Sequence, residues 1–221
     1  MSATVIPAGG GEVIGDAPAR RVEILSSHDS LHATWSRFGP GRDGADLHVH
    51  REHTDLFYVL EGEFTLRLGP QGEPRPLTVG TLAWVPPGVV HGFRNASDAE
   101  LRFLNFHAPG VGFAQYMRDL RDGRPAAYDQ WDPPEDGGRP ISLAGFGDRV
   151  DLPAIKLFPA GIEPGAPESH EDARHTDIYV LEGDLYVNEE RAQAGAWAHV
   201  PPGEPHTLEG YARFLVVHTP A

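Results

Sequence analysis

The stretch DLHVHREHTDLFYVLEG, residues 46–62, places three histidines within six positions and then continues into an apolar run that ends in Glu-Gly. His48 and His50 are two positions apart, so both side chains point to the same face of an extended segment. His53 falls on the opposite face if the extended phase continues, and we interpret it as an ordinary hydrogen-bonded histidine. Asp55 immediately precedes the apolar run. A histidine pair and a carboxylate at the start of a buried strand indicate a metal site.

Several segments of the chain occur twice. YVLEG is found at 58–62 and 179–183, VPPG at 85–88 and 200–203, and RFLNFHAP (102–109) is echoed by RFLVVHTP (213–220). Two homologous halves explain these repeats. Between them, AYDQWDPPEDGGRP (127–140) is rich in proline, glycine and acidic residues and is typical of a linker. We therefore expect an N-terminal domain over residues 1–125, a linker over 126–140 and a C-terminal domain over 141–221.

The composition favours an all-β fold. The 221 residues include 26 glycines and 21 prolines, which suits many short strands joined by tight turns. One helix is predicted over 112–121, where Phe113, Tyr116, Met117 and Leu120 recur at helical spacing. The predicted strands are 21–25, 31–38, 56–60, 64–68, 81–85, 101–106, 155–158, 178–181, 185–187, 196–200 and 214–217. Short strands at this spacing predict a sandwich or barrel in each half.

Charge and composition argue against several classes of function. The formal net charge of −14 disfavours nucleic acid or an anionic membrane as a partner, because both need clustered cations. The chain has no cysteine, which excludes disulfides, thiolate metal sites and cysteine nucleophiles. Lys156 is the only lysine, which argues against Schiff-base chemistry. The first residues lack the pattern of a secretory signal and no window approaches a membrane span, so we expect a cytoplasmic protein.

His91 follows a Pro-Pro-Gly turn and supplies a third imidazole. If it converged with His48, His50 and Asp55 inside a barrel, the group would suit one divalent transition metal: Fe, Mn, Ni, Co, Cu or Zn. The metal would compensate for the burial of the histidines. Histidines satisfied by ordinary hydrogen bonds are the alternative interpretation.

These motifs resemble those of the cupin family. Five residues match the second cupin motif at every fixed position: Gly80, Pro86, Gly88, His91 and Asn95. Four match the first motif: His48, His50, Asp55 and Gly62. Two departures are the aspartate in place of the usual glutamate and a preceding glycine that is out of register. Because the second half repeats the pattern, the resemblance covers nearly the whole chain. It implies two tandem cupin barrels, each a jelly-roll-like double-stranded β-helix, with one short helix after the first.

Carried over residue by residue, the resemblance implies that His48, His50, Asp55 and His91 are metal ligands. Aspartate is one methylene shorter than glutamate. Asp55 therefore binds at a strained distance, acts through a water, or leaves a three-histidine site. Phe93 lies two residues beyond His91 and should share its inward face, so we expect it to contact the substrate.

The second half keeps the scaffold and changes the ligand positions. Alignment on YVLEG places Ser169, Glu171 and Thr176 on those positions and leaves no metal site. A one-residue slip instead aligns His170 with His48, Asp172 with His50 and Asp177 with Asp55. His170, Asp172 and His206 would then form a second site of two histidines and one carboxylate. A structural or substrate-shaping domain is the alternative.

The YVLEGEF segment and the Gly-Phe helix resemble those of quercetin 2,3-dioxygenase-like cupins. This resemblance implies a metal-dependent dioxygenase acting on a phenolic or enolic small molecule. Asp55 would be the fourth ligand or the base that deprotonates the substrate hydroxyl. Two other classes stay open: a metal-dependent isomerase or lyase that stabilises an enolate, and a non-catalytic cupin that binds a small molecule. Whether the halves pair with each other or the chain forms a homodimer also stays open.

Overall fold

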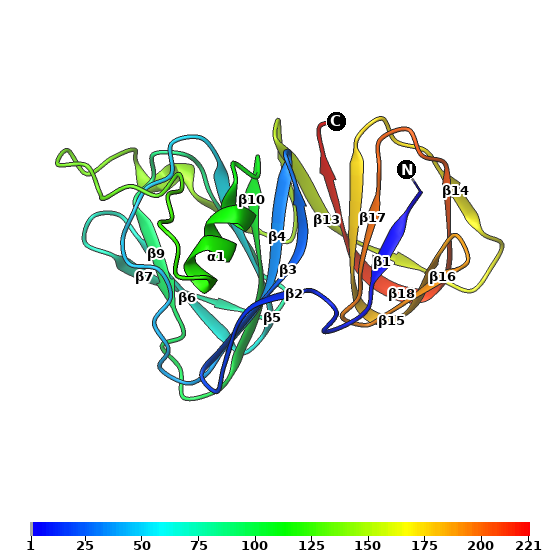
Figure 1. The fold of residues 1–221 in the computed structure, drawn as a ribbon, viewed down its shortest axis with the longest axis horizontal. Coiled ribbons are helices and arrows are strands. Elements are labelled where there is room, and N and C mark those ends of the chain that lie inside the picture. Colours follow the sequence, from blue (N-terminus) through cyan, green and yellow to red (C-terminus); the bar gives the residue numbers. More distant parts are fainter. Residues whose placement is uncertain (1) are drawn as a thin grey trace. The chain divides into compact units, whose positions relative to one another are not determined.

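The structure, a computed structural model, describes residues 2–221 and divides into two compact units (Figure 1). The N-terminal unit is Val13–Asp148, and the C-terminal unit is Arg149–Ala221 together with the residues up to Glu12. Both units consist mainly of antiparallel strands, so the all-β prediction is confirmed. The described residues contain one α-helix, α1 (Phe113–Arg121), where the helical pattern predicted one.

The N-terminal unit has two sheets. The order of the seven-stranded sheet is β11 (Gly145–Gly147), β8 (Leu82–Val85), β5 (Thr54–Glu61), β10 (Leu101–Ala108), β4 (Leu31–Phe38), β3 (Arg20–His28) and β2 (Glu12–Ala17). The three-stranded sheet is β7 (Glu73–Thr78), β6 (Glu63–Leu68) and β9 (His91–Arg94). A short 3₁₀ helix, Ile141–Leu143, precedes β11. Both strand orders have free ends, so these sheets are open where closed barrels were expected.

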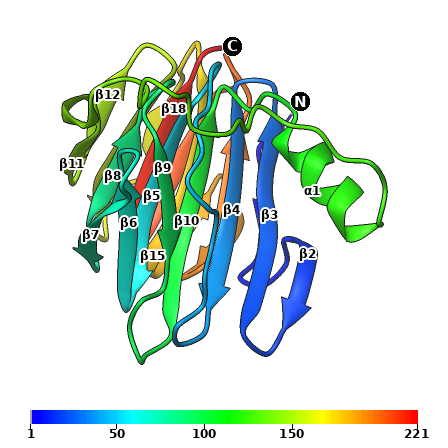
Figure 2. The same cartoon turned by 90° about the vertical axis from the view of Figure 1, so that its left-hand side faces the viewer.

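Phenylalanine side chains join the two sheets of the N-terminal unit. Phe38 and Phe57 come from the seven-stranded sheet and Phe64 from the three-stranded sheet, and all three belong to one buried cluster. The helix α1 covers the outer strands, where its Ala114 and Met117 pack in a second cluster with residues of β2 and β3. Figure 2 shows β10, β4 and β3 side by side, with α1 next to β3.

The C-terminal unit is one eight-stranded open sheet. Its main path is β1 (Thr4–Ile6), β17 (Trp197–Val200), β15 (His175–Val187), β18 (His206–Thr219), β13 (Ile155–Ile162) and β12 (Val150–Leu152). In addition, β14 (Glu168–His170) pairs with β18 and β16 (Glu190–Gln193) pairs with β15. The sequence predicted two strands at 178–181 and 185–187, and the structure joins them into β15, which continues through Gly183.

The two units differ from the expected domain ranges at both boundaries. The strand β1 pairs with β17, with Thr4 opposite His199, so the first residues belong to the C-terminal unit. The expected linker belongs to the N-terminal unit, because Trp131 pairs with Val49 and β11 pairs with β8. These backbone hydrogen bonds join segments that are far apart along the chain. A local pattern rich in proline and glycine therefore does not indicate them.

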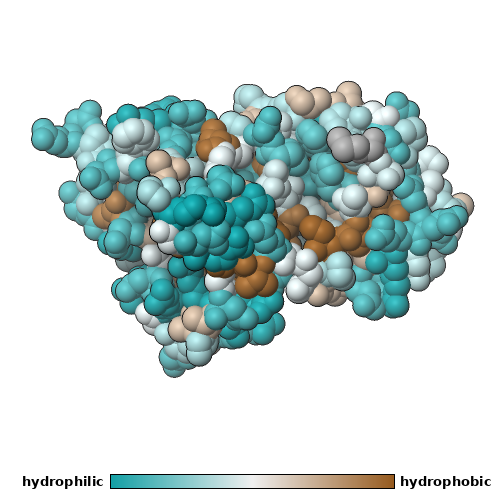
Figure 3. Space-filling view, in the orientation of Figure 1, coloured by the Kyte–Doolittle hydropathy of each residue, from teal (hydrophilic) through white to brown (hydrophobic). Residues whose placement is uncertain are grey.

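The molecular surface agrees with the high net charge of −14. The face seen in Figure 3 is mainly hydrophilic. Within residues 2–221 no helix combines the length and the apolar composition that crossing a membrane requires.

The glycine that ends YVLEG adopts the same left-handed conformation in both halves, with φ of 78° at Gly62 and 80° at Gly183, which is unstrained for glycine alone. A Cβ atom there would meet the carbonyl oxygen of Glu100 or Tyr211. We expect Gly62→Ala and Gly183→Ala each to lower the free energy of unfolding by about 1–3 kcal/mol. Urea unfolding followed by tryptophan fluorescence measures this. Gly15→Ala is the control, because its Cβ meets nothing within 4 Å. Equal stability of all three variants would contradict the expectation.

Candidate metal centre

Backbone pairing brings together the two sequence motifs that contain His48 and His91. His48 and His91 form an antiparallel bridge, in which the His48 N–H donates to the His91 carbonyl at 2.8 Å and the reverse bond measures 2.9 Å. The Gly88 N–H donates to the His50 carbonyl at 2.7 Å. The Pro-Pro-Gly turn is therefore hydrogen-bonded to the His-x-His segment, although 36 residues or more separate the two segments along the chain.

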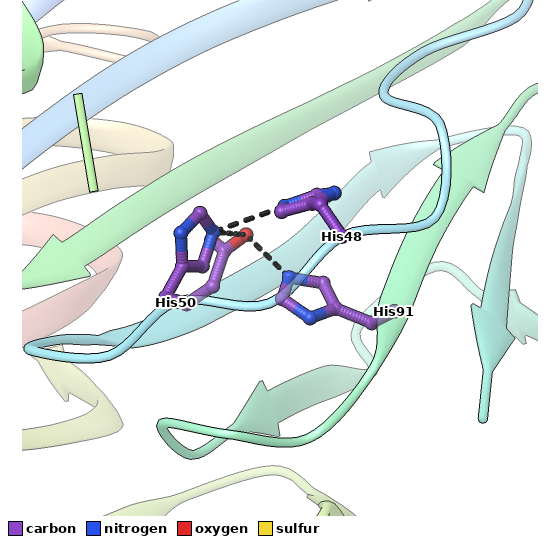
Figure 4. Close-up of side chains that lie close together, drawn as sticks. His48, His50 and His91 are labelled. Atoms are coloured by element: carbon purple, nitrogen blue, oxygen red, sulfur yellow. Dashed lines mark hydrogen bonds and ion pairs between the residues drawn. The ribbon is translucent and has the colours of Figure 1, made fainter. Parts of the chain in front are cut away.

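The predicted ligands converge. His48, His50, Asp55 and His91 are all buried, and one donor atom of each lies within 4.8 Å of the others. The Nε2 atoms of His48 and His50 are 3.1 Å apart. Asp55 Oδ2 lies 3.2 Å from His91 Nε2 and 3.6 Å from His50 Nε2. Figure 4 shows the three labelled imidazoles directed at one point.

The hydrogen bonds of the outer ring nitrogens fix the tautomers. His48 Nδ1 donates to the Asp46 carbonyl at 2.7 Å, and His91 Nδ1 donates to the Val89 carbonyl at 3.0 Å. His50 Nδ1 donates to the carbonyl of Asp129. A carbonyl only accepts, so each neutral ring carries its hydrogen on Nδ1 and a lone pair on Nε2. Three lone pairs and a carboxylate oxygen repel one another unless a cation lies between them. The donor set thus fits a divalent transition metal.

The charge states of the cluster also suit a metal. Burial, together with the charges of His91 and His50, lowers the pKa of His48 to about 3. Burial alone would raise the pKa of Asp55, but the contacts with His107, His50 and His91 outweigh it and hold this pKa well below its usual value. A neutral imidazole at His48 and an ionised carboxylate at Asp55 are protonation states that metal binding requires.

His107 also takes part in the site, although it belongs to neither of the two cupin motifs. It lies opposite Asp55 in the β10–β5 pairing, and its Nε2 is 3.3 Å from Asp55 Oδ1. Asn105 also donates to Asp55 Oδ1 through Nδ2. The carboxylate therefore directs Oδ2 to the histidine cluster, while Oδ1 contacts Asn105 and His107. Only the strand register, which the sequence does not state, reveals these partners.

A cavity of about 230 Å³ adjoins the cluster. His48, His50 and Asp55 form one part of its wall. Aromatic side chains form much of the rest: Phe38, Phe93, Phe103, Phe113 and Tyr116. Phe93 therefore lies where the sequence predicted a substrate contact, and it also stacks on Phe64 with ring centroids 5.3 Å apart.

Strand pairing shows how the two halves correspond. His170 pairs with His206 between β14 and β18, as His48 pairs with His91. The Gly203 N–H donates to the Asp172 carbonyl, as that of Gly88 does to His50. The backbone therefore follows the one-residue slip at His170 and Asp172.

The slip does not extend to Asp177. Thr176 lies opposite Val200 and His218, as Asp55 lies opposite Val85 and His107, so a threonine occupies the place of the fourth ligand. Asp177 instead accepts hydrogen bonds from the side chains of Trp197 and His199 at 3.1 and 2.9 Å.

The second candidate site is not assembled. The Asp172 carboxylate accepts two hydrogen bonds from the Arg174 guanidinium at 3.1 Å. In the part of the chain that the structure describes, His170, Asp172 and His206 do not form a group of converging donor atoms. A cavity of about 400 Å³ lies there, and its lining mixes these three side chains with other polar residues, Glu168 and His218 among them, and with apolar ones.

Comparison with known proteins agrees with this geometry. The family model described as "Cupin domain" matches residues 34–107, which contain His48, His50, Asp55 and His91. Residues 34–107 are a cupin domain.

Two curated proteins are similar to parts of the chain. Quercetin 2,3-dioxygenase from Bacillus subtilis (strain 168) is 31% identical over 120 residues, which is 53% of this chain and 34% of the relative. An uncharacterized protein from Aquifex aeolicus (strain VF5) is 43% identical over 59 residues, 27% of this chain and 47% of the relative. The matches span less than half of either relative.

Solved structures show that the likeness extends over both units. The bacterial pirin YhhW from Escherichia coli, solved in complex with nickel(II), has a TM-score of 0.67 at 13% identity and covers 99% of each chain. An oxalate decarboxylase from B. subtilis has a TM-score of 0.65 at 14% identity and covers 100% of this chain and 77% of that chain. At such identities the likeness concerns the fold. It shows that both units of this chain share the fold of these structures.

The equivalent histidines of the two halves provide matched variants. We expect His48→Ala and His91→Ala to weaken metal binding so that each variant purifies with much less metal, because each deletes one of three Nε2 donors, while the β-type circular dichroism spectrum is retained. His170→Ala and His206→Ala should leave the metal content unchanged. Elemental analysis of the four purified variants checks this. Full metal content in both N-terminal variants would refute the assignment.

The depressed pKa of His48 predicts a pH dependence of the metal-free protein. The imidazole has a pKa of about 3 in the folded state and about 6.5 in the unfolded chain, so the unfolded chain binds more protons between these values. The free energy of unfolding should therefore fall as the pH falls from 6.5 towards 3. This one group contributes at most about 1.4 kcal/mol per pH unit. Urea unfolding at pH 4, 5 and 6 should give a shallower dependence for His48→Ala than for the unsubstituted chain, and identical slopes would contradict it.

Proposed function

We propose that the N-terminal unit is a metal-dependent dioxygenase that acts on a phenolic or enolic small molecule. The proposal rests on one observation: three buried Nε2 atoms and one buried carboxylate oxygen converge at a cavity with aromatic walls. The similarity to a quercetin 2,3-dioxygenase over about half of this chain supports the same reaction class.

The ligand set would be His48, His50, His91 and Asp55. A divalent transition metal held there would supply Lewis-acid and redox chemistry to a substrate oxygen. Asp55 fits the role of fourth ligand better than that of base. Its Oδ1 is held by Asn105 and His107, and its depressed pKa makes it a weak proton acceptor.

The cavity suits a flat, oxygenated ring, because Phe93 and Phe103 are among the aromatic side chains that line it. Arg20 also lines the cavity, with its guanidinium 5.6 Å from the centre of the Phe38 ring. A cation at this position would favour a substrate that binds as a phenolate or enolate.

The test is an oxygen-electrode screen of the metal-loaded protein with a panel of flavonols and simpler phenols. We expect oxygen uptake that matches substrate loss. His91→Ala should lower kcat/KM by about 100-fold or more, because it removes a ligand. His206→Ala, the equivalent change in the C-terminal unit, should stay within about twofold of the unsubstituted chain.

The same screen separates the other classes. Conversion of substrate without oxygen would identify an isomerase or lyase. Tight binding of phenols by calorimetry without any turnover would identify a binding module. Either result would overturn the dioxygenase proposal.

A further inference from the structure

Residues 128–131, which we call the strap, lie beside the metal ligands although the sequence predicts a linker there. The backbone of Trp131 pairs with Val49, the residue between His48 and His50, through hydrogen bonds of 2.9 and 3.0 Å. Asp129 is buried, with 8% of its surface exposed. The strap therefore forms an additional strand-like neighbour of the His-x-His segment.

The strap supplies the hydrogen-bond partner of one ligand. His48 and His91 donate from Nδ1 to carbonyls only two residues away, at Asp46 and Val89. His50 donates to the Asp129 carbonyl, 79 residues away along the chain. Local turns thus orient two of the three rings, whereas the orientation of His50 depends on a remote segment.

The Asp129 carboxylate holds the strap in place. It accepts hydrogen bonds from the backbone N–H groups of Arg51 and Glu52 at 3.0 and 2.7 Å. It also accepts from His53 Nδ1 at 3.0 Å and from Trp131 Nε1 at 2.9 Å. One side chain therefore connects the turn that follows His50 to the segment whose carbonyl orients His50. The ring of Trp131 adds a contact, with the Arg51 guanidinium 3.8 Å from its centre.

Asp129 is not itself placed as a ligand of a second metal. His50, His53 and Asp129 have donor atoms within 4.8 Å of one another. The hydrogens on His50 Nδ1 and His53 Nδ1 are directed at Asp129, so these nitrogens have no lone pair for a metal. The carboxylate already accepts four hydrogen-bond donors. Its role is to position, and not to coordinate.

We propose that Asp129 is a positioning residue of the metal centre, which acts through His50. Its carboxylate anchors the strap, and its carbonyl sets the tautomer and ring orientation of His50, so that Nε2 is aligned with those of His48 and His91. The inference rests on the metal centre of the proposed function. Partners of this kind control metal affinity by about 10–100-fold when they are removed.

The experiment measures the dissociation constant of Ni(II) by competition with a chromophoric chelator. Ni(II) binds nitrogen ligands tightly enough to remain measurable after one ligand is lost, and its visible spectrum reports the ligand field. We expect Asp129→Ala to raise the dissociation constant about 10–100-fold and to shift the spectrum. Asp129→Asn keeps one acceptor oxygen but turns an NH2 group toward N–H donors, so it should recover only part of the affinity. Asp132→Ala, at the exposed residue that directly follows Trp131, removes the same charge and should bind as the unsubstituted chain does.

A double-variant cycle tests whether the effect passes through His50. In a His50→Ala background, Asp129→Ala should weaken Ni(II) binding by less than about twofold. In a His48→Ala background it should keep its full effect. A general loosening of the fold would act alike in both backgrounds and would overturn the inference.

The experiment distinguishes failure of the metal centre from failure of the positioning role of Asp129. If the unsubstituted chain does not bind Ni(II), the metal centre itself is wrong and the inference falls with it. If the unsubstituted chain binds Ni(II) and Asp129→Ala binds it as Asp132→Ala does, only the positioning role is refuted. Should Asp129→Ala fail to fold, Asp129→Asn in the two histidine backgrounds carries the same test.

Discussion

The candidate metal centre of the N-terminal unit depends on the direction of three imidazole lone pairs. A neutral histidine carries one N–H, and in His48, His50 and His91 a backbone carbonyl takes that hydrogen on Nδ1. Three Nε2 atoms are left to face one another in a buried space, an arrangement that is unfavourable without a cation. The fold accepts this because the His48–His91 bridge and the Pro-Pro-Gly turn fix the backbone on both sides. The apolar strand β5 follows directly and separates the group from solvent.

The C-terminal unit shows what the same scaffold becomes without this constraint. Its strands place His170 opposite His206, and the turn at Gly203 contacts Asp172 as in the first unit. Two differences in side chains are enough to remove the converging donor atoms. Thr176 stands at the Asp55 position, and the carboxylate of Asp172 is paired with Arg174. The two units therefore share their strand register and the left-handed glycine of YVLEG, although at these equivalent positions of the described residues the donors converge in the first unit alone.

The sequence predicts the parts of the molecule that depend on local pattern. The repeats gave two related units, the alternating runs gave most of the long strands, and the His-x-His spacing gave the ligands. Strand β7 was missed because Pro74 and Pro76 interrupt it, which an edge strand tolerates. His107 and Asp129 were missed for a different reason: they reach Asp55 and His50 across 52 and 79 positions of the chain. Pairing over such distances is decided by the register and packing of the folded chain, and no short motif encodes it.

The parts of the site that lie outside the repeat distinguish the N-terminal unit from the C-terminal unit. The metal ligands come from elements that both units share. The cavity wall, in contrast, includes Phe113, Tyr116 and Met117 of α1, and within residues 2–221 the C-terminal unit has no such helix. Phe113 also packs edge-on against His107, 4.1 Å between ring centres, so the helix that shapes the cavity contacts the histidine behind Asp55. The strap is likewise confined to the N-terminal unit. The scaffold that both units share thus places the predicted ligand positions, whereas the shape of the cavity and the support of these residues depend on segments that only one half contains.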